Sequence, residues 1–133
     1  MYKLIIILIL LLGLLLTGCG SADGGMQRID GQIVWEDGGT LPAGSTVSVQ
    51  VVNASLADAT ETLVQTTFEA EGSPPIDFFV EYDPSQVDER MNYSVTVRIV
   101  DPDGQLLYIT MTAQYIIEQG QVNNDITVLV EPV

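Results

Sequence analysis

The chain has 133 residues, one cysteine, no histidine and a formal net charge of −14 at pH 7. The missing histidine excludes histidine-based catalytic triads and histidine metal sites, and a single cysteine cannot form an internal disulfide. The negative charge argues against binding to nucleic acid phosphates or to anionic lipid headgroups. A chain of this length is expected to form one domain with its own core.

The N-terminal segment has the pattern of a signal peptide. Lys3 precedes an apolar run over residues 4–16, which is shorter than the roughly 20 residues of a membrane-spanning helix. The run leads into Leu16-Thr17-Gly18-Cys19, which resembles the lipobox of bacterial lipoproteins. This resemblance implies cleavage after residues 1–18 and acylation of Cys19. The alternative is an uncleaved signal anchor with an incidental cysteine.

The lipobox interpretation predicts where the protein lies and which charged side chains the mature chain keeps. More than one acyl chain on Cys19 holds a protein stably on a cell membrane or outer membrane, here with the domain outside the cytoplasm. Residues 19–27 are small, polar and rich in glycine, so they are interpreted as a flexible tether. Without the signal peptide, Arg28, Arg90 and Arg98 are the only basic side chains beside 18 acidic ones.

From residue 28 to residue 133 the apolar pattern has period two, which predicts a single β-domain. The first four predicted strands span residues 28–36, 45–51, 63–69 and 76–82. The clearest is 45–51, where Val47, Val49 and Val51 alternate with polar residues. A turn at Asp37-Gly38-Gly39 follows the first strand, and residues 54–60 form a polar connector with room for one helical turn.

The second half of the domain continues this pattern after a polar crossing over residues 83–91. The predicted strands span residues 92–100, 105–117 and 125–130, and the second of them needs a bend near Thr112-Ala113. Asp101-Pro102-Asp103-Gly104 predicts a hairpin turn between the first two. About seven short strands separated by turns predict an all-antiparallel, Greek-key-like β-sandwich.

Tyr93 has two open interpretations. It begins an alternating strand directly after the polar crossing, which is where the tyrosine corner of Greek-key sandwiches occurs. In that motif the hydroxyl bonds to backbone a few residues upstream. Alternatively, Tyr93 is an ordinary core aromatic at the start of a strand.

Three groups of carboxylates are candidates for a chemical site. Asp77 and Glu81 would have to act as an acid and base pair, as in glycosidases, but solvated charge on a strand face is the better interpretation. Asp101-Pro102-Asp103-Gly104 lacks the further ligands of a calcium loop, so a plain turn is favoured. Asp88-Glu89 is read as a solvated loop rather than a weak cation site. We therefore expect no enzymatic activity, no cofactor and no metal site.

Two binding surfaces remain open from the sequence. Aromatic side chains would line a ligand groove if they were exposed. The candidates are Trp35, Tyr82, Tyr108 and Tyr115. An edge strand is the better-supported binding surface of the two, because its unpaired backbone groups can form hydrogen bonds with an extended peptide.

Several blocks of sequence, in order, resemble the YbaY-type lipoproteins, a family grouped with the type III secretion lipoprotein chaperone (pilotin) YscW. The blocks are Gly31-Gln32-Ile33-Val34, residues 41–51, Asn53-Ala54-Ser55-Leu56-Ala57-Asp58-Ala59, residues 75–78, 82–84, 93–99, 104–108 and 128–133. The resemblance implies a compact β-sandwich on a lipid anchor, in a family whose pilotins bind a secretin's C-terminal segment. We expect a non-enzymatic envelope protein that binds another protein as an assembly chaperone. The alternative is a small-molecule or glycan-binding sandwich.

Overall fold

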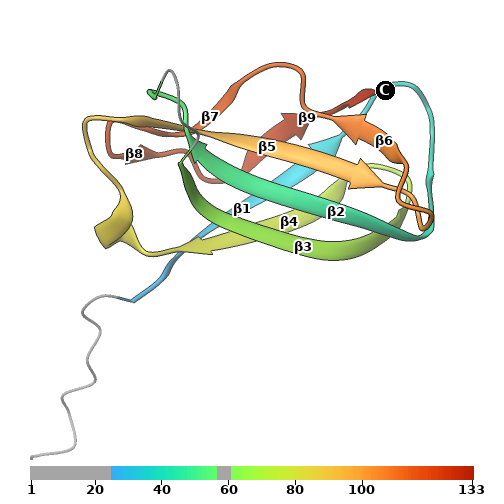
Figure 1. Ribbon diagram of the computed structural model, residues 1–133, viewed down its shortest axis with the longest axis horizontal. Coiled ribbons are helices and arrows are strands. Elements are labelled where there is room, and N and C mark those ends of the chain that lie inside the picture. The colour runs from blue at the N-terminus through green and yellow to red at the C-terminus, as the bar shows by residue number, and fades with distance from the viewer. Residues whose placement is uncertain (1–24, 57–60) are drawn as a thin grey trace, which may run out of the picture.

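Two β-sheets face each other in the computed structural model, which describes residues 25–56 and 61–133 (Figure 1). The strands are β1 (Gln27–Val34), β2 (Leu41–Asn53), β3 (Thr62–Gly72), β4 (Ile76–Tyr82), β5 (Asn92–Val100), β6 (Leu106–Ile109), β7 (Gln114–Glu118), β8 (Gln121–Val122), β9 (Ile126–Leu129) and β10 (Glu131–Pro132). A 3₁₀ helix, Pro84–Gln86, lies between β4 and β5. The all-β sandwich expected from the sequence is confirmed.

Part of the sequence-based organisation lies outside the described residues. This applies to the predicted signal peptide, to residues 19–24 of the predicted tether, which include Cys19, and to residues 57–60 of the predicted connector. β1 begins at Gln27, one residue before the predicted start of the domain. Within the described ranges, no helix is both long and apolar enough to cross a membrane.

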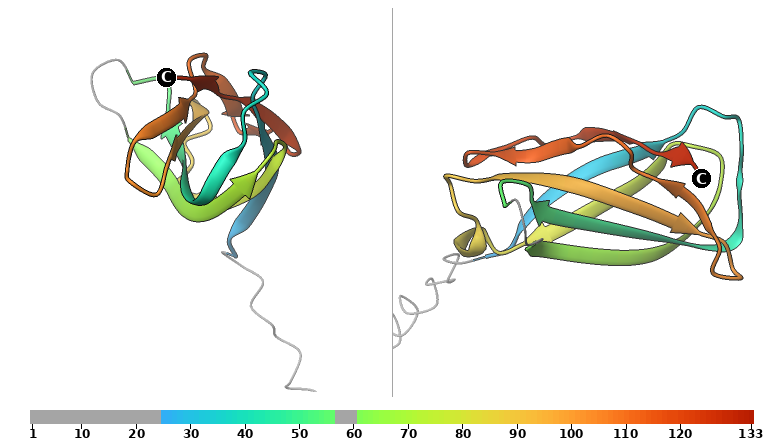
Figure 2. Two further views of the ribbon diagram at one scale, coloured as in Figure 1. Left: turned by 90° about the vertical axis from the view of Figure 1, so that its right-hand side faces the viewer. Right: turned by 45° about the horizontal axis from the view of Figure 1, so that its top comes forward.

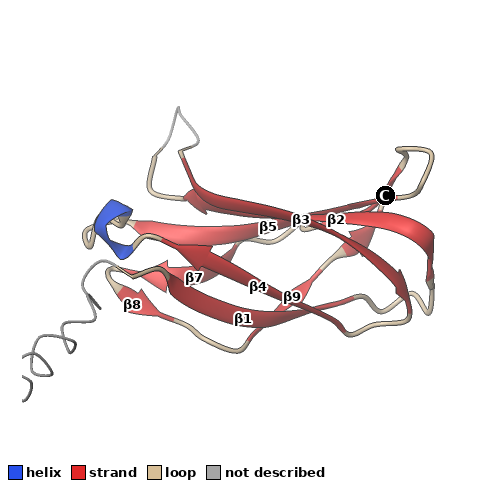
Figure 3. Ribbon diagram, turned by 90° about the horizontal axis from the view of Figure 1, so that it is seen from below, coloured by secondary structure: helices blue, strands red, loops and turns tan. Residues whose placement is uncertain are grey.

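The two sheets have different sizes. The smaller sheet has the order β4-β1-β9, and the larger has the order β10-β6-β5-β2-β3, with β7 pairing β5 and β8 pairing β7. Figure 3 shows β2, β3 and β5 in one layer and β1, β4 and β9 in the other. In the left view of Figure 2, along the strands, the two sheets enclose a common interior.

The expectation of a wholly antiparallel fold is wrong at one pair. β1 and β9 are parallel, and Gly31 lies opposite Ile126, 95 residues further along the chain. Period-two alternation assigns faces but not strand direction, so this pairing was not visible in the sequence. The described residues also form ten strands rather than about seven, because β8 and β10 are two-residue strands and the predicted strand 105–117 is divided into β6 and β7.

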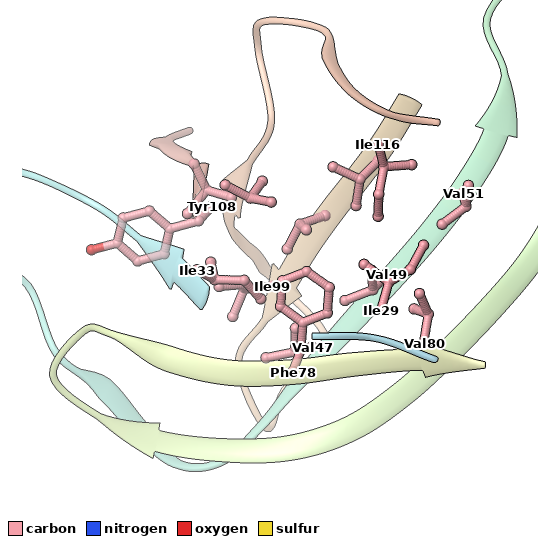
Figure 4. Close-up of a cluster of buried hydrophobic side chains, with 14 of the residues drawn as sticks. Ile29, Ile33, Val47, Val49, Val51, Phe78, Val80, Ile99, Tyr108 and Ile116 are labelled. Carbon is pink, nitrogen blue, oxygen red and sulfur yellow. The ribbon is translucent and has the colours of Figure 1, made fainter. Parts of the chain in front are cut away.

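The core lies between the inner faces of the two sheets (Figure 4). Alternation along each strand sends apolar side chains inward, as the sequence predicted. The fully covered side chains include Ile29, Ile33, Val47, Val49, Val51, Val80, Val95, Val97, Ile99, Ile116, Ile117 and Val128. Burial of such side chains is the main favourable term in the stability of the domain.

The loop between β1 and β2 is fixed to the larger sheet by two aromatic residues. The Trp35 and Tyr108 rings are stacked with centroids 4.9 Å apart. Trp35 Nε1 donates to the Gly39 carbonyl at 2.7 Å, and the Tyr108 hydroxyl donates to the Asp37 carboxylate at 2.8 Å. These contacts hold the indole against the core.

Candidate partner-binding surface

β3 is a long edge strand whose inner face is incompletely covered. It has 11 residues, pairs only with β2, and none of its residues is fully buried. Val64, Thr66 and Phe68 are only half-buried, although they lie opposite fully buried valines on β2. β2 has a strand on each side, whereas β3 has one neighbour, so one flank of its inner face is left to solvent.

β3 and β4 belong to different sheets, although they follow one another in the chain. A connection through Ser73, Pro74 and Pro75 joins β3, the edge of the larger sheet, to β4, an edge of the smaller one. No ladder of backbone hydrogen bonds joins the two strands in the described part of the chain. In Figure 1 both strands run back from this connection and cross in the view, and Figure 3 places them in different layers. We call the margin of the molecule formed by these two edge strands the β3–β4 seam.

Hollows lie at both ends of β3. One, of about 340 Å³, is lined by Glu61, Thr62, Leu63, Gln86 and Tyr93. The other, of about 320 Å³, is lined by Ala43, Gly44, Glu69, Ala70 and Glu71. Each end of β3 therefore has space for a side chain of a bound partner.

Exposed carboxylates border the seam. Glu69 and Glu71 lie on the outer face of β3, and Asp77 and Glu81 lie on the outer face of β4. The ion pairs found among residues 25–56 and 61–133 are Arg28–Asp30 and Arg90–Asp88, so these four carboxylates make no salt bridge there. Arg28 does lie opposite Glu81 in the β1–β4 ladder.

A separate hollow of about 530 Å³ lies on the outer face of the smaller sheet. Its wall includes the exposed ring of Phe79, and the Arg28 guanidinium lies 3.8 Å from the centre of that ring. Arg28 Nε also donates to Asp30 at 3.0 Å, and Gln32 donates to Asp77 at 3.2 Å. Arg28 is thus engaged with Asp30 and Phe79, and Asp77 with the neutral Gln32.

Tyr93 connects the polar crossing, residues 83–91, to β5. Its side chain is buried, and its hydroxyl accepts a hydrogen bond from the Asp88 backbone N–H at 3.0 Å. Asp88 precedes Tyr93 by five residues. The contact therefore ties the end of the crossing to the beginning of β5.

The three candidate groups of carboxylates have local roles in the structure. Asp77 and Glu81 are four residues apart on the exposed face of β4, which places their Cα atoms about 13 Å apart, too far for a glycosidase-type pair. Asp101 makes the predicted hairpin turn: its carboxylate accepts from the backbone N–H groups of Asp103 and Gln105 at 2.9 and 2.8 Å. Asp88 pairs with Arg90 at 2.9 Å.

The aromatic residues do not form an open groove. Trp35, Tyr82 and Tyr108 are buried in the core, and Tyr115 alone of the four candidates is exposed, at 44%. Burial, followed by the hydrogen bond to Asp37, raises the pKa of Tyr108. A buried indole and two buried phenols weaken the hypothesis of a ligand groove.

The incomplete cover of β3 was not predicted from the sequence, although a signal for it was present. Its inner positions carry Thr66 and Ala70, whereas the inner positions of β2 opposite β3 are mostly valine. Smaller and more polar inner residues are typical of a strand at the margin of a core.

Comparison with known proteins connects this architecture to a family. Residues 25–128 match the family model described as type III secretion system lipoprotein chaperone (YscW). The fold is similar to the structure of an alternative pilotin from the type II secretion system of Vibrio cholerae, with 27% sequence identity and a TM-score of 0.70. That similarity covers 81% of this chain and 99% of the other. A search of curated proteins returned no match.

Proposed function

Because the chain belongs to the YscW family of type III secretion system lipoprotein chaperones, we propose that it is an anchored chaperone that assembles another protein of the cell envelope. The similar Vibrio cholerae structure is that of a pilotin, which supports the same role. In this proposal the acyl chains on Cys19 hold the domain at a cell membrane or the outer membrane. The β-domain then binds its client outside the cytoplasm.

The observation that carries the proposal is the open edge of β3. This strand offers unpaired backbone groups along its free side and a half-buried inner face beside them. An extended segment of a client can add to such an edge as a further strand, with hydrogen bonds to the backbone and apolar contacts below. A small-molecule or glycan-binding role is less favoured, because three of the four candidate aromatics are buried.

Site-specific photo-crosslinking tests the proposal in intact cells. The photoreactive residue p-benzoylphenylalanine replaces Thr66, which lies half-buried on the inner face of β3. The matched control replaces Thr96, which lies on β5, two strands away from β3 in the larger sheet. We expect one envelope protein to be crosslinked at position 66 and not at position 96.

The client must also depend on the chaperone. We expect its level in the target membrane to fall in cells that lack the chain or that carry Cys19→Ser. Equal crosslinking at both positions, or a client whose membrane assembly is unchanged in those cells, would contradict the proposed function.

A further inference from the structure

We infer that the segment bound at the β3–β4 seam is an extended chain in which apolar residues alternate with polar ones, and that the polar residues beside Glu69 and Glu71 are basic. This inference rests on the proposed function and specifies the chemistry of the client. It follows from the two faces of β3 and from the charges along them.

The two faces of β3 impose a period of two on any added strand. Even-numbered residues face the core, since Val64, Thr66 and Phe68 pair with the buried Val51, Val49 and Val47 of β2. Side chains of neighbouring strands that lie side by side face the same way. Every second residue of an added strand therefore extends the inner face, where an apolar side chain covers the half-buried residues of β3.

The remaining residues of the added strand face outward beside the odd-numbered positions of β3. These are Gln65 and Thr67 in the first half of the strand and Glu69 and Glu71 in the second, all exposed. Opposite charges at cross-strand positions attract, and like charges repel. The client therefore needs Lys or Arg at one end of the segment, whereas neutral polar residues suit the other end.

The positions of the other charged side chains also favour a client with basic residues. Across the seam, β4 presents Asp77 and Glu81 on its outer face. Arg28 and Arg90 are already paired with Asp30 and Asp88, and Arg98 lies on β5 rather than at the edge. Arg28 also lies opposite Glu81 in the β1–β4 ladder, so that carboxylate already has a cation beside it. Glu69 and Glu71 make no salt bridge within the described residues, and a basic segment supplies their cation.

Synthetic peptides test this chemistry directly on the full-length lipidated protein in detergent. The probe is a fluorescent peptide of about nine residues that alternates valine and lysine. Two controls accompany it: one has glutamate in place of lysine, and the other has the same valines and lysines grouped into two blocks. Binding is measured by fluorescence anisotropy at an ionic strength of about 0.15 M.

We expect the alternating valine–lysine peptide to bind about tenfold more tightly than either control. In the protein, the double variant Glu69→Gln/Glu71→Gln should weaken its binding about fivefold and reduce its salt dependence. The matched control is Glu118→Gln/Glu131→Gln, which changes the net charge equally but lies on β7 and β10, away from β3. It should leave the affinity unchanged.

Equal binding of the lysine and glutamate peptides would overturn the inference, as would equal losses in the two double variants. Equal binding of the block peptide would show attraction by net charge alone and would also overturn it. If the inference failed while position 66 still captured one client in cells, the proposed function would stand with a client of different chemistry. If the peptide bound as expected and no client were captured, the proposed function would fail instead.

Discussion

At the scale of single residues, four of the 18 acidic side chains stabilise turns. Four aspartates each accept a hydrogen bond from the backbone N–H two residues further on, a geometry that fixes tight turns. The pairs are Asp37 with Gly39, Asp83 with Ser85, Asp88 with Arg90 and Asp101 with Asp103. The bonds from Ser85 lower the pKa of Asp83. These carboxylates are therefore parts of the fold rather than free ligands.

Asp88 gives a prediction in acid. Hydrogen bonds from the Arg90 side chain, then from its backbone N–H, lower the pKa of Asp88 to about 2. A carboxyl whose pKa is lower in the folded state stabilises the fold above its unfolded pKa of about 3.9, and this contribution is lost as the pH falls toward 2. We expect Arg90→Ala to raise the pKa of Asp88, measured by NMR titration of its carboxyl carbon. Arg28→Ala, which removes the partner of Asp30, should leave it unchanged; an equal rise in both variants would contradict this explanation.

Tyr93 gives a prediction about the polar crossing. We interpret its hydroxyl contact with the Asp88 N–H as a tyrosine corner. Tyr93→Phe removes that hydrogen bond and should lower the free energy of unfolding by about 0.5–1.5 kcal/mol in urea titrations. The control is Tyr115→Phe, because Tyr115 is 44% exposed. Equal stabilities of the two variants would show that Tyr93 acts only as a core aromatic.

At the scale of strands, the missing side chain of Gly31 allows β1 to pack closely against its neighbours in the smaller sheet. Gly31 lies on β1 between β4 and β9, opposite Phe78 on one side and Ile126 on the other. A Cβ atom at this position would lie 2.6 Å from the Phe78 ring and 2.9 Å from the Ile126 carbonyl oxygen. Real Cβ atoms do not approach other atoms so closely. The absent side chain lets the Phe78 ring lie against β1.

We expect Gly31→Ala to lower the free energy of unfolding by about 1–3 kcal/mol, because the added methyl group overpacks a filled core. Chemical denaturation of the purified protein measures the change. Adding Phe78→Leu should recover part of the loss in the double variant, since it removes the ring that the methyl group meets. An undiminished stability of Gly31→Ala, or a double variant with fully additive losses, would argue against this contact.

Most strands could be predicted because one face of each is buried. The alternation of Val47, Val49 and Val51 fixed the inner face of β2, and Asp101-Pro102-Asp103-Gly104 fixed the turn before β6. These features depend on residues close together in the chain. Period two and turn chemistry are local signals.

The remaining features depend on residues far apart in the chain. The parallel pairing of β1 with β9 joins positions that are 95 residues apart, as with Gly31 and Ile126, and no local pattern encodes it. The partial exposure of β3 depends on where the smaller sheet ends, at β4. Cys19 stays a prediction, since it lies outside the described residues.

At the scale of the whole molecule, the lipid anchor and the domain should be separable. β1 begins at Gln27, eight residues after Cys19, and the core is built from residues after that point. We expect Cys19→Ser to abolish labelling by a radioactive fatty acid and to move the protein from the membrane to the soluble fraction. Its melting temperature should equal that of the unlipidated wild-type domain. Ser21→Ala is the control in the same segment, and unchanged lipid labelling of Cys19→Ser would contradict the lipobox interpretation.

The pairing of β1 with β9 has a consequence for the export that the predicted signal peptide implies. A protein led across a membrane by its N-terminal signal delivers β1 first, whereas residues 126–129 follow nearly last. Until then β1 lacks one of its two neighbours, and an unpaired strand edge is prone to aggregation. In a chain exported in this way, translocation must therefore be almost complete before β9 can close the smaller sheet.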